Sequence, residues 1–287
     1  MKTALLILAP FLIIAFGNRS STDVDKYISI EKLIKNRSIQ EQITGLGGYQ
    51  ENCISFDLKN TTSDTLHVWI ETGRRLISGD STLQDIFLVK EIKTNIPPYE
   101  SKKLMGYGFC CEATMHAPYP KSVFSIGTMA PAPWVKLAEL INQNNFPTDA
   151  IQNAVWVFSN NHPLSSVTDN NTPAIKLLRS TIASLKGIEL PWYSISYEKD
   201  TSTLFTGRAE KLWGTLEYSL KSNAIVTINV RNQNGILMAT LMKAMAHNPG
   251  KYLFDVDLPV KNWKKGDYEI NIYEDYSNLN LTKKFKL

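Results

Sequence analysis

Four side chains that can bind a metal ion stand close together in the middle of the chain: Cys110, Cys111, Glu112 and His116. Thiolate, carboxylate and imidazole groups are ligands of zinc and copper, and the loop between Cys111 and His116 is long enough to bring them together. The sequence has no Cys-x-x-Cys and no second ligand pair at a defined spacing. A disulfide bond and a surface histidine account for the same residues, so we predict no metal site and no cofactor.

The remaining cysteine, Cys53, supplies a partner for that disulfide bond. Side chains alternate between the two faces of a strand, and Cys53 falls on the polar face of its apolar run, as Cys110 does on its own. Cys111 falls on the aromatic face, and a bond between two neighbouring cysteines would be strained. We therefore predict a Cys53–Cys110 bond and a buried free thiol at Cys111. A bulge at Gly106 or Gly108 would exchange the two assignments.

Carboxylates suited to hydrolysis occur at Asp80, Asp85 and Glu91, the residue types that glycosidases use in pairs. Their spacing alone does not place two of them at the required separation, and solvated charges in a loop and strand account for the same pattern. The Gly-x-Ser-x-Gly of a nucleophile elbow does not occur in the sequence. We predict no catalytic residue.

Aromatic residues surround the predicted helices, and they indicate binding rather than catalysis. Trp134 and Trp156 lie on apolar helix faces and are expected in the core. Trp192 and Tyr193 follow a proline outside those helices. Rigid aromatic rings provide contact area at little entropic cost, so we predict Trp192 and Tyr193 as the contact for a sugar or a peptide.

Length and composition limit the class of protein that carries these residues. The chain has 287 residues, which corresponds to about two domains. Apolar residues make up 43% and charged residues 20%, close to the average for globular proteins. The net charge of +4 is spread along the chain, whereas a nucleic-acid surface needs clustered lysine and arginine. We expect no nucleic-acid partner.

The first residues have the pattern of a secretory signal peptide. Lys2 is followed by an uncharged apolar run from Ala4 to Phe16, which is too short to span a bilayer, and Gly17 is a small residue suited to a cleavage site. We predict a signal peptide over residues 1–17 and no transmembrane segment after its removal. The mature protein would be secreted, periplasmic or bound at the cell surface, where disulfide bonds persist.

Hydrophobic periodicity predicts an α+β domain over residues 24–200. Apolar runs separated by turn residues predict strands at Cys53–Leu58, Thr65–Glu71, Leu83–Ile92 and Lys102–Cys111, which we assign to an antiparallel β-sandwich. A period of 3.6 residues then predicts about three helices, which run from Pro133 to before Pro147, over Ile151–Phe158 and from Thr172 to Gly187. We expect Asp149 to cap the second helix with Gln152 as its capping-box partner.

The polar segment Glu198–Arg208 predicts an inter-domain linker, which we place at residues 201–208. An all-β domain follows over residues 209–287. Its strands are expected at Trp213–Leu220, Ala224–Arg231, Gly235–Lys243, Lys251–Leu258, Asp267–Glu274 and Asn280–Leu287. The dipeptide Asn234-Gly235 predicts a hairpin turn between two of them.

The order of motifs in this last segment resembles a known class of domain. Val226-Thr227-Ile228-Asn229-Val230, Gly266-Asp267-Tyr268-Glu269-Ile270 and the ending Lys283-Lys284-Phe285-Lys286-Leu287 are similar to an immunoglobulin-like β-sandwich of exported bacterial proteins. Such domains occur in flagellar hook-capping proteins and as the C-terminal sorting domains of the type IX secretion system. The resemblance covers roughly residues 208–287 and implies an immunoglobulin-like fold that serves attachment or sorting.

Together these features predict an exported, non-enzymatic protein that binds an unknown extracellular ligand or surface partner. The first domain would carry the binding site and the last domain would serve attachment. A secreted hydrolase that acts on an extracellular polymer is the alternative. A pocket with converging carboxylates or histidines would favour the hydrolase, and an aromatic surface would favour binding.

Overall fold

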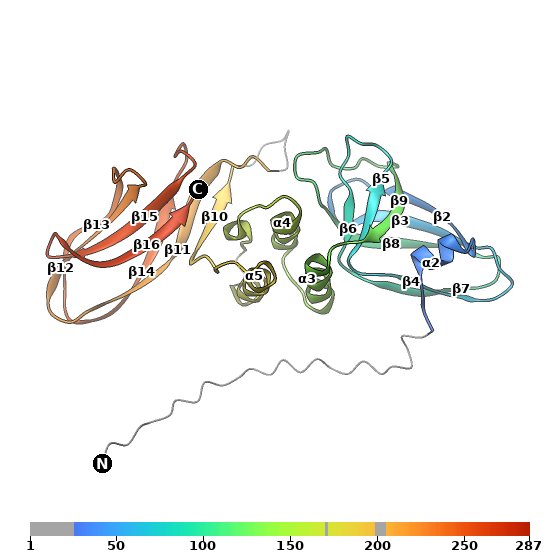
Figure 1. Cartoon of the computed structure of the whole chain (residues 1–287), viewed down its shortest axis with the longest axis horizontal. Helices are drawn as coiled ribbons and strands as arrows, with labels where there is room; N and C mark the ends of the chain where they lie inside the picture. Colours follow the sequence, from blue (N-terminus) through green and yellow to red (C-terminus); the bar gives the residue numbers. More distant parts are fainter. Residues whose placement is uncertain (1–25, 170–171, 199–204) are drawn as a thin grey trace, which may run out of the picture.

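The computed structural model describes residues 26–169, 172–198 and 205–287, so the predicted signal peptide lies outside the described residues. Strands dominate, and a single layer of helices lies between two β-rich parts (Figure 1). The expected α+β class, rich in strands, is confirmed at this level. None of the helices in the described ranges is long and apolar enough to cross a membrane.

The first β-rich part is a closed barrel of antiparallel strands in the order β2-β3-β8-β6-β5-β9. Its strands are β2 (Ile39–Gly45), β3 (Gln50–Asn60), β5 (Arg74–Ser78), β6 (Ile86–Leu88), β8 (Ser101–Cys110) and β9 (Val123–Met129). A small sheet packs beside the barrel and consists of β1 (Ile28–Ser29), β4 (Leu66–Ile70) and β7 (Ile92–Ile96). The short helix α2 (Ile30–Lys35) follows β1 directly.

The expected open sandwich is therefore wrong for this part of the chain. The sequence did not predict three strands of the barrel, β2, β5 and β9, and the pairing of β2 with β9 at Ile43 and Phe124 closes the sheet on itself. The interior is narrow, because a Cβ atom at Gly106 or Gly108 would overlap Phe56 or Ile86. These two glycines of β8 let the opposite side chains fill the barrel.

The helical layer matches the predicted periodicity. It consists of α3 (Ala132–Gln143), α4 (Thr148–Ser159), the short 3₁₀ helix η1 (Leu164–Ser166) and α5 (Thr172–Lys186). The expected cap of α4 is wrong, since the helix begins after Pro147 without a side-chain cap. Asp149 lies in its first turn, and Gln152 is buried and donates a hydrogen bond to the carbonyl oxygen of Cys110 instead.

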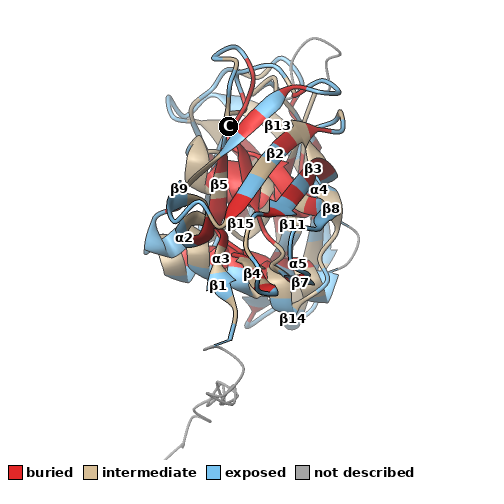
Figure 2. Cartoon of the chain, turned by 90° about the vertical axis from the view of Figure 1, so that its right-hand side faces the viewer, coloured by how far each residue is buried: buried red, intermediate tan, exposed pale blue. Residues whose placement is uncertain are grey.

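The second β-rich part contains two antiparallel sheets that share one apolar core. The first sheet consists of β10 (Tyr193–Tyr197), β11 (Ala209–Leu220) and β14 (Gly250–Pro259). The second consists of β13 (Leu237–His247), β12 (Ala224–Asn232), β15 (Asp267–Glu274) and β16 (Asn278–Lys286). All six expected strands and the Asn234-Gly235 hairpin are confirmed. Buried residues gather along the long axis of the molecule (Figure 2).

The expected linker connects two strands of one sheet. β10 pairs antiparallel with β11, although it precedes the predicted boundary at residue 200. Glu198 and Arg208 face each other at the end of this hairpin, where the amide of Glu198 donates to the carbonyl oxygen of Arg208 at 2.9 Å. Residues 193–197 thus belong to the C-terminal sheet. A division into two independently folding domains stays a prediction.

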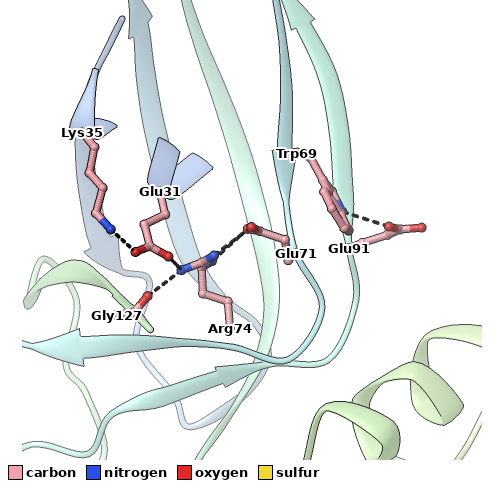
Figure 3. Close-up of polar contacts among 7 residues, drawn as sticks. All are labelled: Glu31, Lys35, Trp69, Glu71, Arg74, Glu91 and Gly127. Carbon is pink, nitrogen blue, oxygen red and sulfur yellow. Dashed lines mark hydrogen bonds and ion pairs between the residues drawn. The ribbon is translucent and has the colours of Figure 1, made fainter. Parts of the chain in front are cut away.

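A buried arginine joins the barrel to the small helix beside it (Figure 3). Arg74 of β5 is 1% exposed, and its Nε and Nη2 donate to both carboxylate oxygens of Glu71 at 2.8 and 2.7 Å. Its Nη1 donates to Glu31 of α2 at 3.0 Å and to the carbonyl oxygen of Gly127 at 2.6 Å. Hydrogen bonds from Lys35 and Arg74 lower the pKa of Glu31. One side chain thereby fixes three segments of the chain.

We expect Arg74→Met to lower the free energy of unfolding by about 3–5 kcal/mol, because Glu71 would stay buried without its partner. Chemical denaturation of the purified protein measures the change. Lys35→Met is the control, since it removes an exposed contact to the same Glu31 and should leave the stability unchanged within error. An Arg74→Met protein as stable as the parent would contradict the role assigned to this arginine.

Candidate functional site

A groove lies between the helical layer and the outer face of the sheet β10-β11-β14. Its volume is about 880 Å³, and its lining comes from the start of β3, from α4, from the loop after η1 and from β10, β11 and β14. We call it the groove. Segments far apart in the sequence meet here, so the groove exists only in the folded chain.

Strand alternation places the polar side chains of β11 and β14 in the groove. Leu212 and Val256 point into the core of the second β-rich part, so their neighbours Trp213, Asp255 and Asp257 point the other way. Trp213 and Asp257 are directly paired across the two strands. The sheet thereby presents an indole ring beside two carboxylates.

Helix α4 supplies the opposite wall of the groove. Gln152 is 2% exposed, and its Nε2 donates to the carbonyl oxygen of Cys110 at 2.8 Å. Its Oε1 has no partner among the described residues, and neither has the indole Nε1 of Trp156, one turn further along the helix. Unpartnered polar atoms in buried positions are rare, so this wall has unused hydrogen-bonding capacity.

The groove carries a strong negative charge. Five carboxylates line it against one lysine, namely Asp149, Asp169, Glu198, Asp255 and Asp257 against Lys211. Lys211 forms an ion pair with Asp257 at 2.8 Å, and Thr215 donates to Asp255 at 2.8 Å. Hydrogen bonds from Arg208 and Lys261 lower the pKa of Glu198, which is therefore ionised at neutral pH.

An aromatic cluster lies at one end of the groove. Phe205 stacks on His162 with ring centroids 3.8 Å apart, and Tyr197 lies 4.7 Å from Phe205. Burial lowers the pKa of His162 to about 4, so the imidazole is neutral at physiological pH. The cluster joins the loop after α4 to the hairpin of the C-terminal sheet.

A smaller pocket continues the groove toward α5. Its volume is about 250 Å³, and it shares Thr168, Asp169 and Trp213 with the groove. Arg179 and Lys176 of α5 also line it. We call it the α5 pocket.

The predicted contact residues lie elsewhere. Trp192 donates from Nε1 to the carbonyl oxygen of Lys284, and the hydroxyl of Tyr193 accepts from the amide of Lys286. Both rings are half-buried against the core of the second β-rich part, and neither lines the groove or the α5 pocket. They attach β10 to β16. A ligand contact at Trp192 and Tyr193 stays a prediction.

The cysteines divide between two cores, but the predicted polar face of Cys53 is wrong: Cys53 shares the barrel core with Ile54, because the register of β3 shifts between Asn52 and Ile54. Cys53 and Cys110 lie together in the barrel core, whereas Cys111 lies in the core under the helices. All three are buried and free in the structure, so the predicted Cys53–Cys110 bond is not formed there. Burial raises the pKa of Cys53 and of Cys111 to about 12, which leaves little reactive thiolate at neutral pH.

The three carboxylates that the sequence offered for hydrolysis each have hydrogen-bond partners of their own. Asp85 accepts hydrogen bonds from Arg75 at 2.5 Å and from the amide of Ser78 at 2.9 Å. Asp80 accepts from the hydroxyl of Thr82, and Glu91 from the indole of Trp69 at 3.0 Å (Figure 3). In the described ranges no three histidine, cysteine or acidic side chains are grouped so that they could hold a metal ion. This includes the set around His116 that the sequence offered.

The residues of the groove did not stand out in the sequence. Trp213, Asp255 and Asp257 occupy the polar positions of two alternating strands, a pattern that any solvent-facing strand shows. Their only distinctive signal is the two carboxylates at positions i and i+2 opposite a tryptophan. That signal requires the strand register, which the sequence alone does not supply.

Comparison with known proteins gives no family. No protein-family model matches the chain, and no curated protein matches it. Among solved structures, it is weakly similar to the crystal structure of DesR, a beta-glucosidase from Streptomyces venezuelae in complex with D-glucose, with 10% identity and a TM-score of 0.18. The match covers 86% of this chain and 47% of that one, so the chain spans about half the length of the beta-glucosidase. A likeness this weak carries no argument about fold or function.

We expect oxidation of the purified protein to join Cys53 to Cys110 and to leave Cys111 reduced, because only the first two share a core. Peptide mapping by mass spectrometry without reduction identifies the bond. Cys111→Ser is the control and should give the same bond. A Cys53–Cys111 or Cys110–Cys111 bond would show that the assignment of faces is wrong.

Proposed function

We propose that this protein is an exported, non-enzymatic binding protein whose groove holds a basic segment of a peptide. The observation that carries the proposal is the charge of the groove. Five carboxylates face one lysine there, although the chain as a whole has a net charge of +4. Carboxylates concentrated in a cleft attract and orient a cationic partner.

The aromatic lining supports the same kind of ligand. Trp213, Tyr197 and Phe205 line the groove among the carboxylates. Ammonium and guanidinium groups bind favourably over aromatic faces, and their aliphatic stems pack on the same rings. A lysine or arginine side chain would satisfy both features. The unpartnered Oε1 of Gln152 offers an acceptor for a donor group of the ligand.

The carboxylates are less suited to hydrolysis, the alternative function. A glycosidase needs one carboxyl group whose pKa is raised so that it can act as a general acid. The pKa of Glu198 is lowered instead. Asp257 is paired with Lys211, and Asp255 accepts a hydrogen bond from Thr215. These contacts favour charge recognition over proton transfer.

Binding of a fluorescein-labelled tetralysine peptide tests the groove. We expect the double variant Asp255→Asn/Asp257→Asn to bind it about ten-fold more weakly, since two exposed charge contacts contribute about 1–2 kcal/mol together. Fluorescence anisotropy measures the affinity, which should also fall with rising salt. Glu217→Gln, on the same strand face as Trp213 but outside the groove, is the control.

Equal binding of tetralysine by the parent and the double variant would reject the groove as the site. Tetraglutamate should not bind to either protein. Release of reducing sugar from a polysaccharide by the parent, lost in the double variant, would favour the hydrolase instead.

We further propose that the C-terminal pair of sheets is an immunoglobulin-like domain that serves attachment or sorting. Two antiparallel sheets around one core support this assignment together with the resemblance of the sequence motifs. Strand β16 is an edge strand of its sheet, and Lys284 and Lys286 are exposed on it. A basic edge strand is available to a partner and resists pairing with other edges.

We expect Lys284→Gln/Lys286→Gln to change where the protein accumulates without unfolding it. Only the backbone of these lysines contacts Trp192 and Tyr193, so the strand stays attached. Fractionation of cells that express the intact chain measures the location, and circular dichroism measures the fold. Lys243→Gln/Lys251→Gln, on two other exposed strand positions, is the control. An unchanged location with an intact fold would reject the sorting role.

A further inference from the structure

Arg179 of α5 is a buried arginine whose hydrogen bonds all go to uncharged acceptors. It is 9% exposed. Its Nη1 donates to the hydroxyl of Ser194 at 2.8 Å, and its Nη2 donates to the carbonyl oxygens of Pro191 and Tyr193 at 2.8 and 2.7 Å. Its Nε has no hydrogen-bond partner among the described residues. Among the residues that the structure describes, no acidic side chain forms an ion pair with Arg179.

A buried positive charge without a counter-charge is unfavourable. Buried charges in proteins are normally paired, because dipoles alone replace the lost hydration incompletely. Arginine does not escape the cost by losing its proton, since its pKa lies far above neutrality even where burial lowers it. Three of the five N–H donors of the guanidinium group are used in these hydrogen bonds, so two donors and an unpaired positive charge are left for an anion.

The α5 pocket lies at this arginine and has the size and charge for one small anion. Its volume is about 250 Å³, and Arg179 and Lys176 face a single acidic residue there, Asp169. The formal charge of the lining is thus +1, which matches a monoanion better than a phosphate dianion. Lys176 is exposed and forms no ion pair within the described part of the chain.

The remaining walls of the pocket combine apolar residues with the hydroxyl groups of Thr168, Thr172 and Ser194. Ile175, Leu190, Pro191 and Trp213 line it beside the charged groups. A site that combines a cation with apolar walls fits a carboxylate attached to an apolar side chain. Trp213 and Thr168 also line the groove, so one ligand can occupy both cavities.

We propose that the α5 pocket binds the free C-terminal carboxylate of the peptide that lies in the groove. Arg179 and Lys176 hold the carboxylate, the apolar walls take the last side chain, and the basic residues before it face the carboxylates of the groove. The proposal rests on the proposed function and deepens it, because it fixes the direction of the peptide and requires a free end. Capture of a terminal carboxylate is a recurring mode of peptide recognition.

The test uses two pairs of probes that differ only in the terminal charge. The tripeptide Lys-Lys-Leu and its C-terminal amide cover both cavities, and N-acetyl-leucine and its amide cover the pocket alone. We expect each acid to bind about ten-fold more tightly than its amide, the ratio for one charge-assisted hydrogen bond. Isothermal titration calorimetry on the purified protein measures the affinities.

Two variants assign the difference to the pocket. Arg179→Lys keeps the charge but removes the guanidinium donors, and we expect it to reduce the preference for the acid. Lys176 is exposed, so Lys176→Gln should leave the fold intact. We expect this variant to bind both acids about three-fold more weakly and to bind the amides as the parent does. Lys136→Gln, an exposed lysine of α3, is the matched control.

The outcomes separate the two proposals. Equal binding of acid and amide overturns the carboxylate pocket, and the groove still stands if Asp255→Asn/Asp257→Asn weakens the tripeptide and its amide alike. An unchanged preference for the acid in Lys176→Gln and in folded Arg179→Lys also overturns the pocket. No binding of any probe overturns both proposals. Stronger competition by glucuronate than by N-acetyl-leucine would assign the pocket to acidic sugars and overturn the peptide.

Discussion

The architecture depends on two strands of the barrel that are apolar on both faces. Ile86 and Leu88 of β6 point into the barrel core, while the intervening Phe87 and the following Val89 point outward, and all four are fully buried. On β8, Cys110 faces the barrel, whereas Phe109 and Cys111 face the helices. An apolar outer surface on a barrel must be covered, and α3, α4 and α5 cover it. The groove exists because that helical layer has a second side, which meets the C-terminal sheet.

The sequence predicted those elements whose pattern is local. The three helices follow from apolar spacing, and the C-terminal strands follow from alternation and from the turn at Asn234-Gly235. The strand expected at Leu83–Ile92 contains β6, but the expected bounds were too wide, since a continuous apolar run has no period that marks where the strand begins and ends. β2 and β9 were missed because their closure of the barrel depends on a pairing between Ile43 and Phe124, far apart in the sequence.

The candidate site could not be predicted from the sequence, because its residues are brought together only by strand pairing and helix packing. The sequence favoured Trp192 and Tyr193 because two aromatic residues follow a proline outside the predicted helices. In the structure both rings pack against the core of the second β-rich part. In the structure their polar atoms are used by the backbone of β16. Trp213 and Asp257 are ordinary outward-facing strand residues, and only the pairing of β11 with β14 brings them together. In the sequence, Arg179 is a charged residue of a predicted helix and would be expected on its exposed face. Its burial depends on the contacts of α5 with Pro191, Tyr193 and Ser194.

The attachment of β10 to β16 constrains the order in which the chain can fold during synthesis. Trp192 and Tyr193 bond to the backbone at positions 284 and 286, so more than ninety residues must follow them before their partners exist. The strands of the barrel pair with one another and with no strand of the C-terminal sheets, so these pairings can form earlier on the nascent chain. The C-terminal sheets cannot be completed until β16 has left the ribosome. The second wall of the groove, the sheet β10-β11-β14, is therefore the part that becomes attached to its neighbouring sheet last.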